Sequence, residues 1–471
     1  MLGRESDHPI VPMKQGNSCG GKGRDRLVDF SYRNILLLRG GKRVETYLAK
    51  IAKVAREKPE EKLTSLVHFI NVDTLRAAHY GQDGRKAVGV DAVTKAEYEE
   101  NLEANLADLV KRMKRQAYKP QPVRRAYIRK EGTDKLRPLG IPAYEDKLVQ
   151  SVLADILSGI YEEIFLPFSY GFRPNRSCLL ALQVLNQIIE KRKVHYVVDA
   201  DIKGFFDNVD HEWLMKFLKH RIAHVNLLRL IQRLLRAGVM EDGRRHETMS
   251  GTPQGGLISP VLANVYLHYV LDLWFRGVVR KQCKGEAHIV RYADDFVCCF
   301  EHKEDATKFY ELLVERLAKF GLQVAEDKTK IIRFGRPRDG DDERPGTFDF
   351  LGFTHFGGRS KKGRFRVKRK TAKKKLRRSI QNAKVWLRDN MHSPMKVLMR
   401  TLNAKLRGHY EYYGITDNTS SISLFCHRVK RMLKWTLGRR SQKGYLTEEQ
   451  FSLLLNRFPI AEPRIRHSIY G

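Results

Sequence analysis

Residues 289–300 read Ile-Val-Arg-Tyr-Ala-Asp-Asp-Phe-Val-Cys-Cys-Phe, and this stretch decides the fold. Two apolar runs flank a short polar insert that contains Asp294 and Asp295. Runs rich in β-branched and aromatic residues around a tight insert predict a β-hairpin. Because successive strand residues point to opposite faces, only a turn brings both carboxylates to one edge of the sheet. Two adjacent anions need a cation, and carboxylate ligands suit Mg²⁺. The alternative is a solvated Asp-Asp turn, and a third carboxylate would favour the metal.

A candidate third carboxylate lies upstream, where residues 194–211 read Val-His-Tyr-Val-Val-Asp-Ala-Asp-Ile-Lys-Gly-Phe-Phe-Asp-Asn-Val-Asp-His. This pattern predicts a short apolar strand that ends in carboxylates, followed by Asp210 as the N-cap of a helix. Asp199 and Asp201 share a face of the strand and Asp207 lies further on, so chemistry alone does not choose among the three. A strand-end aspartate beside an Asp-Asp hairpin favours a site for two metal ions, as polymerases and nucleases use.

Together, the Tyr292-Ala-Asp-Asp insert and the Asp201-Ile-Lys-Gly-Phe-Phe run resemble motifs C and A of a reverse transcriptase. More narrowly, they resemble the reverse transcriptase–maturases encoded by bacterial group II introns, from about residue 63 to the last residue. The resemblance implies two Mg²⁺ ions as cofactors. It implies Asp201, Asp294 and Asp295 as catalytic residues and metal ligands, with Ile202 added to the metal ligands.

The fold implied by the resemblance is α+β. It is a right-hand polymerase with fingers and a palm, made of an antiparallel sheet and helices, followed by an α-helical thumb or maturase (X) domain. The expected bounds are an N-terminal basic extension at 1–62, fingers at 63–165, palm at 166–358, thumb/maturase domain at 359–438 and a short DNA-binding region at 439–471. No Cys/His cluster follows residue 439, so the H-N-H endonuclease of many relatives is expected to be absent.

Contacts to the phosphates of a nucleotide are predicted in two places. Residues 123–142 form two β-like runs around a turn, a hairpin rich in cations. Cations over a triphosphate stabilise the charge that its oxygens carry during transfer. By the resemblance this is the fingers hairpin, with Lys130 and Arg137 as contacts, although a basic hairpin alone is more often a solvated surface. Lys328, in a stretch that resembles motif D, is implied beside the departing pyrophosphate.

Contacts to the base and sugar are implied by a glycine-rich stretch and by motif A. Residues 251–264 read Gly-Thr-Pro-Gln-Gly-Gly-Leu-Ile-Ser-Pro-Val-Leu-Ala-Asn and resemble motif B. Glycines there let the backbone approach a ligand closely. The contacts implied are Gln254 and Gly255, with Asn264 as a weaker candidate. Phe206 is implied as the steric gate that excludes a 2′-hydroxyl, and Phe205 is the alternative for that place.

The charge of the chain predicts a nucleic-acid partner. Its 88 Lys and Arg against 54 Asp and Glu give a net charge of +34. Such an excess indicates a large polyanion, with nucleic acid first and an anionic membrane surface second. Basic helices with interleaved aromatics, expected at 372–390, 394–414 and 420–438, suit RNA recognition, although most of these aromatics also fit helix cores. The predicted nucleic-acid contacts are Arg173, for which a turn is the alternative role, and Lys361, Lys362, Arg364, Arg366, Lys368, Arg369, Lys370, Lys373, Lys374, Lys375, Arg377 and Arg378.

The expected function is an RNA-directed DNA polymerase that also binds its intron RNA to assist splicing and supports mobility by target-primed reverse transcription. Expected partners are the intron RNA in a ribonucleoprotein, a DNA target and primer, and dNTPs, with no membrane and no protein partner. No signal segment or long apolar run is seen, so a cytoplasmic protein, nucleoid-associated on target DNA, is expected. Two alternatives are a protein that acts chiefly as a maturase, and a related polymerase of a defence or CRISPR-associated system.

Overall fold

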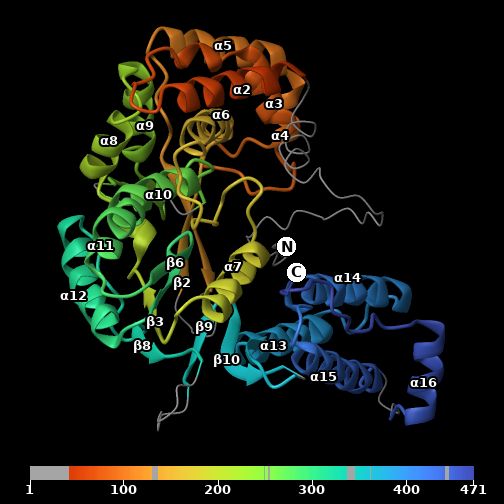
Figure 1. The fold of residues 1–471 in the computed structure, drawn as a ribbon. Helices are drawn as coiled ribbons and strands as arrows, with labels where there is room; N and C mark the ends of the chain where they lie inside the picture. Colours follow the sequence, from red (N-terminus) through yellow and green to blue (C-terminus); the bar gives the residue numbers. More distant parts are fainter. Residues whose placement is uncertain are drawn as a thin grey trace.

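The computed structural model describes residues 42–129, 136–248, 250–252, 255–336, 345–360, 362–440 and 445–470, with side chains from residue 48. Helices of the N-terminal part lie at the top of Figure 1, strands and further helices occupy the middle, and the blue C-terminal helices lie to one side. Within these ranges no helix is both long enough and apolar enough to cross a membrane.

The central sheet has four antiparallel strands in the order β6-β7-β3-β8. Its strands are β3 (Tyr196–Asp201), β6 (Ala287–Tyr292), β7 (Asp295–Phe300) and β8 (Lys330–Arg333). The hairpin predicted from residues 289–300 is therefore confirmed as β6 and β7. Alternate residues of β3 and β7 enter two different hydrophobic cores, Val198 and Phe296 in one and Val197 and Val297 in the other. Both faces of this sheet are thus covered.

The N-terminal helices pack around α6, which is buried on nearly every side, at polar residues such as Asp146 and Gln150 as well as at apolar ones. The surrounding helices are α2 (Lys42–Glu57), α3 (Val72–Tyr80), α4 (Lys95–Glu100) and α5 (Leu102–Lys114), and α6 itself is Tyr144–Tyr161. Apolar residues at helical spacing over 46–80 predict helix, but between Glu57 and Val72 the only helix of the structure is the short 3-10 helix Val67–Phe69. There Asn71 accepts a hydrogen bond from the backbone N–H of Thr74 at 3.1 Å, in a capping box that starts a separate helix.

A second sheet, in the order β2-β1-β4-β5, contains the predicted basic hairpin. Its strands are β1 (Val123–Arg129), β2 (Leu136–Ile141), β4 (Val239–Glu241) and β5 (Arg244–His246). The antiparallel pairing of β1 with β2 confirms the hairpin, whose turn lies outside the described residues. Parallel pairing of β1 with β4 joins residues 123–124 to residues 239–240, far along the chain.

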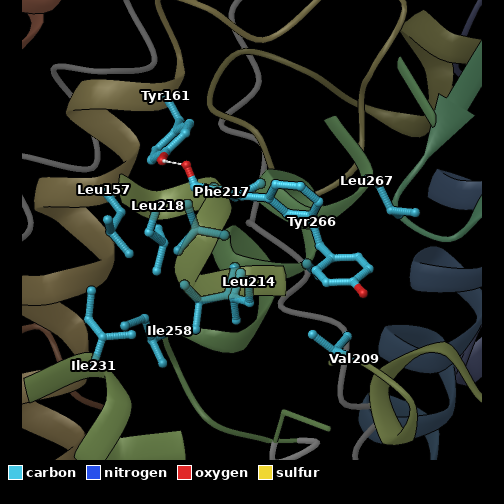
Figure 2. Close-up of a cluster of buried hydrophobic side chains, with 14 of the residues drawn as sticks. Leu157, Tyr161, Val209, Leu214, Phe217, Leu218, Ile231, Ile258, Tyr266 and Leu267 are labelled. Carbon is cyan, nitrogen blue, oxygen red and sulfur yellow. Dashed lines mark hydrogen bonds between the residues drawn. The ribbon is translucent and has the colours of Figure 1, made fainter. Parts of the chain in front are cut away.

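The largest core lies between α6 and three helices of the middle of the chain (Figure 2). Those helices are α8 (His211–Lys219), α9 (Val225–Leu235) and α10 (Ser259–Leu267). The sequence pattern of residues 211–237 predicts a single helix, but the structure has the pair α8 and α9 there. Phe217 and Leu218 of α8 pack against Tyr161 of α6 and Ile231 of α9, and Tyr161 Oη donates to the carbonyl of Phe217 at 3.5 Å.

The C-terminal part joins a three-stranded sheet, in the order β9-β10-β11, to a helical bundle with its own core. Its elements are β9 (Thr347–Phe350), β10 (Phe353–Arg359), β11 (Phe365–Thr371), α13 (Lys373–Asp389), α14 (Met395–Tyr413), α15 (Thr419–Gly438) and α16 (Glu448–Arg457). The three helices predicted at 372–438 are confirmed. The last residues return to the sheet, since Tyr470 Oη donates to the carbonyl of Val367 at 2.9 Å.

Candidate active site

Aspartates from two strands meet at one end of the central sheet. Asp201 ends β3, Asp295 begins β7, and the two are opposite each other in the strand register. Asp199 lies two residues before Asp201, on the same face of the sheet. Asp294 stands in the turn itself, after Ala293, whose φ is +58°. The fold thus brings together the three acids that the sequence singled out.

The acids raise one another's pKa values because they are crowded and partly buried. Burial and then Asp199, Asp294 and Asp201 raise the pKa of Asp295 to about 8. Burial, then Asp349 and Asp201, raise the pKa of Asp199 to about 7. Burial is also the main cause that raises the pKa of Asp294, to which Asp201 adds. Such a cluster of anions favours a bound cation.

Three basic side chains lie close to these acids. Lys328 forms an ion pair with Asp201. Arg137, on β2, lowers the pKa of Asp294 by its charge, so the basic hairpin faces the acids. The third is Lys375 at the start of α13: burial lowers its pKa, and the charge of Asp295 raises it. The sequence had assigned Lys375 to nucleic acid, and the two elements that bring it to Asp295 lie 80 residues apart.

The carboxylates at the end of the sheet fit an Mg²⁺ ion whose coordination is completed by other ligands. Among the residues that the structure describes, no three His, Cys, Asp or Glu side chains stand close enough to hold a metal by themselves. Mg²⁺ is usually bound through one or two carboxylates, with waters and substrate phosphates as the other ligands. Ile202, which the resemblance adds to the metal ligands, forms an isolated antiparallel β-bridge with Val324. Next to it the N–H of Ala325 donates to the carbonyl of Asp201 at 2.8 Å, so hydrogen bonds hold the backbone at both residues.

The described residues of the glycine-rich loop, 250–252 and 255–258, pack against motif A and the basic hairpin; because of the nucleotide contacts predicted there, we call it the nucleotide loop. The N–H of Thr252 donates to the carbonyl of Phe206 at 2.8 Å. Phe205 is 2% exposed in the core whereas Phe206 is only partly buried, so Phe206 is the phenylalanine that can meet a ligand. Gly255 has a φ of +112°, and a Cβ there would come within 2.8 Å of the carbonyl oxygen of Gly140. Predicted contacts Gln254, Lys130 and Lys361 lie outside the described residues.

Arg173 is a correction to the predicted nucleic-acid contacts. Its side chain is 4% exposed and its guanidinium donates to both carboxylate oxygens of Glu162, at 2.9 to 3.2 Å. It also donates to the carbonyls of Leu166 and Ser169, each at 2.8 Å. With its donors engaged inside the protein, Arg173 holds the loop that precedes α7 (Cys178–Lys191) and does not face a phosphate. The alternative role in a turn is the correct one.

Arg369 is a second correction, and strand geometry is the reason. Val367, Arg369 and Thr371 alternate along β11 and are all buried, with Arg369 0% exposed. Its Nη2 donates to Asn186 Oδ1 of α7 at 2.5 Å. The remaining described members of the basic set are exposed or half-buried: Lys362, Arg364, Arg366, Lys368, Lys370, Lys373, Lys374, Lys375, Arg377 and Arg378.

Asn264, the weaker candidate for a nucleotide contact, is also inside the protein. It is 1% exposed, and its amide donates to the carbonyl of Gly171 at 2.7 Å. Its amide oxygen accepts from Arg291, a residue to which the sequence had given no role. An arginine inside an apolar strand before two aspartates is the signal that would have indicated a structural partner nearby.

Comparison with known proteins places the chain in a family. It matches the family model "Reverse transcriptase (RNA-dependent DNA polymerase)" over residues 128–355. It is 29% identical to Group II intron-encoded protein LtrA of Lactococcus lactis subsp. cremoris, over 85% of this chain and 78% of that protein. Protein YkfC of Escherichia coli is 32% identical over 60% of this chain and 80% of YkfC.

A solved structure of telomerase from Candida albicans, with a fragment of telomeric RNA, aligns with a TM-score of 0.41 at 12% identity. The alignment covers 81% of this chain and 69% of that one, a likeness too low to add to the assignment. The family model matches the part of the chain that carries the aspartates, and LtrA matches most of its length. The chain therefore belongs to the reverse transcriptase family, among the proteins encoded by group II introns.

Proposed function

We propose that the chain is the RNA-directed DNA polymerase of a group II intron, and that it binds the intron RNA to assist splicing. Mobility would follow by target-primed reverse transcription, with a DNA target supplying the primer. The meeting of Asp201, Asp294 and Asp295 at one end of the central sheet carries this proposal. Family membership supports the polymerase, and the intron-encoded relatives support the link to splicing.

In this proposal Asp201, Asp294 and Asp295, with Ile202, hold two Mg²⁺ ions. When bound, such ions stabilise charge on the attacking and leaving oxygens of phosphoryl transfer. Arg137 binds the triphosphate from the side of the basic hairpin. Lys328, paired with Asp201 in the structure, moves to the leaving phosphates when a nucleotide binds. Each cation then stands where negative charge is greatest.

The parts of a right-hand polymerase map onto the fold as follows. Residues 63–165 are the fingers, 166–358 the palm, 359–438 the thumb/maturase domain, and 439–471 a DNA-binding region. We add α2 to the fingers, because Leu48, Ile51 and Ala55 pack into the core around α6 rather than in a separate extension. Residues 239–246 join the fingers sheet through β4, although they lie within the palm by sequence.

Extension of a DNA primer on an RNA template tests the polymerase directly. We expect full-length cDNA with Mg²⁺ and dNTPs, and none after chelation of the metal. A chain that extends the primer on DNA but never on RNA would contradict an RNA-directed enzyme.

Replacement of Phe206 should relax the choice of sugar. Phe206→Val shortens the partly buried ring that we propose lies under the ribose, so ribonucleotides gain access. We expect the preference for dNTPs over rNTPs to fall by about tenfold or more, since a lost steric contact of this size is worth about 1–3 kcal/mol. Competing dNTP and rNTP incorporation on one template measures it. Phe205→Leu is the control, since Phe205 is in the core. An equal loss of preference in that variant would show that Phe206 is not the steric gate.

The exposed cations of α13 should contribute to RNA binding through phosphate contacts. In the triple variant of Lys373, Lys374 and Arg377 to Gln, we expect weaker RNA binding and a log–log salt slope that is smaller by about 2. Filter binding of intron RNA at several salt concentrations measures both. The control replaces Lys303, Lys308 and Lys319 of α12 (Lys303–Lys319) with Gln. These three residues are also exposed, and their replacement removes the same charge. Equal slopes for the two triple variants would show that α13 has no special contact.

A further inference from the structure

A buried arginine lies directly behind the turn that presents Asp294. Arg291 is in β6, two residues before Ala293, and its side chain is 0% exposed. Its Nε and Nη2 donate to the two carboxylate oxygens of Asp272 at 2.7 and 2.5 Å. Asp272 is also 0% exposed, so the two charges form a bidentate pair inside the protein. Such a pair is costly to desolvate and needs further hydrogen bonds to be stable.

The other side of the same guanidinium holds the turn. Nη1 of Arg291 donates to the carbonyl oxygen of Ala293 and to Oδ1 of Asn264, each at 3.0 Å. Asn264 in turn donates to the carbonyl of Gly171, which packs against the backbone of Ala293. Arg291 therefore joins α10, which follows the nucleotide loop, to the residue that precedes Asp294.

An irregular helix delivers Asp272 to this arginine. After α10 the helix continues as a π-helical segment, His268–Asp272, with a second one at Phe275–Val279. A π-helical turn contains an extra residue, which rotates the side chains that follow it, and such turns are frequent at functional sites. His268 Nδ1 is 4.0 Å from Asp272, but burial lowers the pKa of His268 to about 4. His268 is therefore neutral near pH 7, and Arg291 is the cation that balances Asp272.

The turn needs such a support because its backbone is strained. Ala293 has a φ of +58°, and a non-glycine residue in this region costs about 1–3 kcal/mol. It persists only where the surroundings determine it. A hydrogen bond from Arg291 to the carbonyl of Ala293 opposes relaxation of the turn, which would carry Asp294 away from Asp201.

We propose that Arg291 is a positioning residue for Asp294, held in place by Asp272 and Asn264. Through the carbonyl of Ala293 it fixes the acid, and through α10 it ties the acid to the loop where the nucleotide binds. The proposal rests on the polymerase function and on Asp294 as one of its metal ligands.

Arg291→Lys and Arg221→Lys form a matched pair for the test. Arg221 is another buried arginine, 4% exposed, which donates to the carbonyl of Ala55 at 3.0 Å and to that of Lys58 at 3.1 Å, between α8 and α2. Lysine keeps the charge in both variants but loses the fork of hydrogen bonds. Primer extension gives kcat and the KM for dNTP, electron paramagnetic resonance gives the affinity for Mn²⁺, and thermal unfolding gives the loss of stability.

We expect Arg291→Lys to lower kcat and weaken Mn²⁺ binding by about 10- to 100-fold, the usual effect of removing the support of a ligand. The KM for dNTP should stay within about twofold of the wild-type value, because the nucleotide contacts remain. Arg221→Lys should lose comparable stability and keep both kcat and Mn²⁺ affinity. Equal kcat values or equal Mn²⁺ affinities for the two variants, measured below their unfolding temperatures, would overturn the proposal.

Asn264→Ser is the second variant, and it decides the matter if Arg291→Lys does not fold. It removes the bonds to Gly171 and Arg291 and leaves the Arg291–Asp272 pair intact. A fall in kcat with Mn²⁺ binding weakened supports the positioning role, and wild-type values of both overturn it. An inactive wild-type protein that binds no Mn²⁺ would instead overturn the polymerase function, and this proposal with it.

Discussion

Asp201→Asn and Asp294→Asn should each abolish cDNA synthesis, with kcat lowered by more than about 10³-fold, while the affinity for RNA is expected to stay at the wild-type value. Each change removes a carboxylate that we propose as a metal ligand, and loss of several kcal/mol of charge stabilisation corresponds to three decades or more in rate. Primer extension on an RNA template measures the rate. We expect RNA binding to be retained because the exposed cations that we propose for it lie far along the chain.

Asp207→Asn is the control for these two variants. Asp207 is the third acid that the sequence offered, but it is exposed and lies beyond the end of β3. We expect it to keep its activity within about threefold, as exposed substitutions usually do. If polymerase activity were kept in Asp294→Asn but lost in Asp207→Asn, the metal ligands that we propose would be the wrong residues. Splicing assisted by the Asp294→Asn protein would separate the RNA-folding role from polymerisation.

Gly171→Ala should lower the rate of cDNA synthesis by about 10²-fold without unfolding the protein. A Cβ at this position would lie 2.3 Å from the backbone nitrogen of Ala293 and 2.9 Å from the carbonyl carbon of Tyr292. Both contacts are backbone, which cannot rotate away, so the turn must shift. A displacement of about 1 Å at a reacting group costs about that factor in rate.

Gly408→Ala, within α14, is the matched control for this change. Nothing lies within 4 Å of a Cβ built there, and alanine stabilises a helix relative to glycine. Circular dichroism and primer extension on both variants check the result. If Gly171→Ala polymerised at the wild-type rate, the contact between Gly171 and the turn would have no role in placing Asp294.

The sequence predicted the elements that rest on local patterns. Apolar runs around a short polar insert were enough to find the β6–β7 hairpin, β-like runs around a turn were enough for the basic hairpin, and helical periodicity was enough for the helices of the C-terminal part. The order of the motifs then brought Asp201 and the two adjacent aspartates together. Period-two alternation also placed Asp199 on the face of Asp201, and the structure agrees.

The errors arise where a residue's role depends on a tertiary partner that the local pattern does not reveal. Arg173 and Arg369 are predicted from the sequence to contact nucleic acid, but both are buried, where Arg173 donates to Glu162 and Nη2 of Arg369 donates to Asn186. Glu162 lies only 11 residues before Arg173, but no periodic pattern links the two in the loop between them. Arg369 and Asn186 are 183 residues apart, so nothing local marks that pairing. A uniform run of cations also hides the alternation of β11, which turns every second side chain inward. Lys375 of α13, expected to contact nucleic acid, lies near Asp295, which is 80 residues away in the chain.

The two-sided burial of the central sheet has a consequence for the durability of the site. β3 and β7 are each paired on both edges, and their Val197, Val198, Phe296 and Val297 are fully buried between two cores. Strands of this kind open only when the whole domain unfolds, whereas loops and helix ends fray at little cost. The platform for Asp201 and Asp295 therefore belongs to the slowest-opening unit of the molecule. Nucleic acid can enter, slide and leave through repeated local openings elsewhere while the spacing of the acids is preserved.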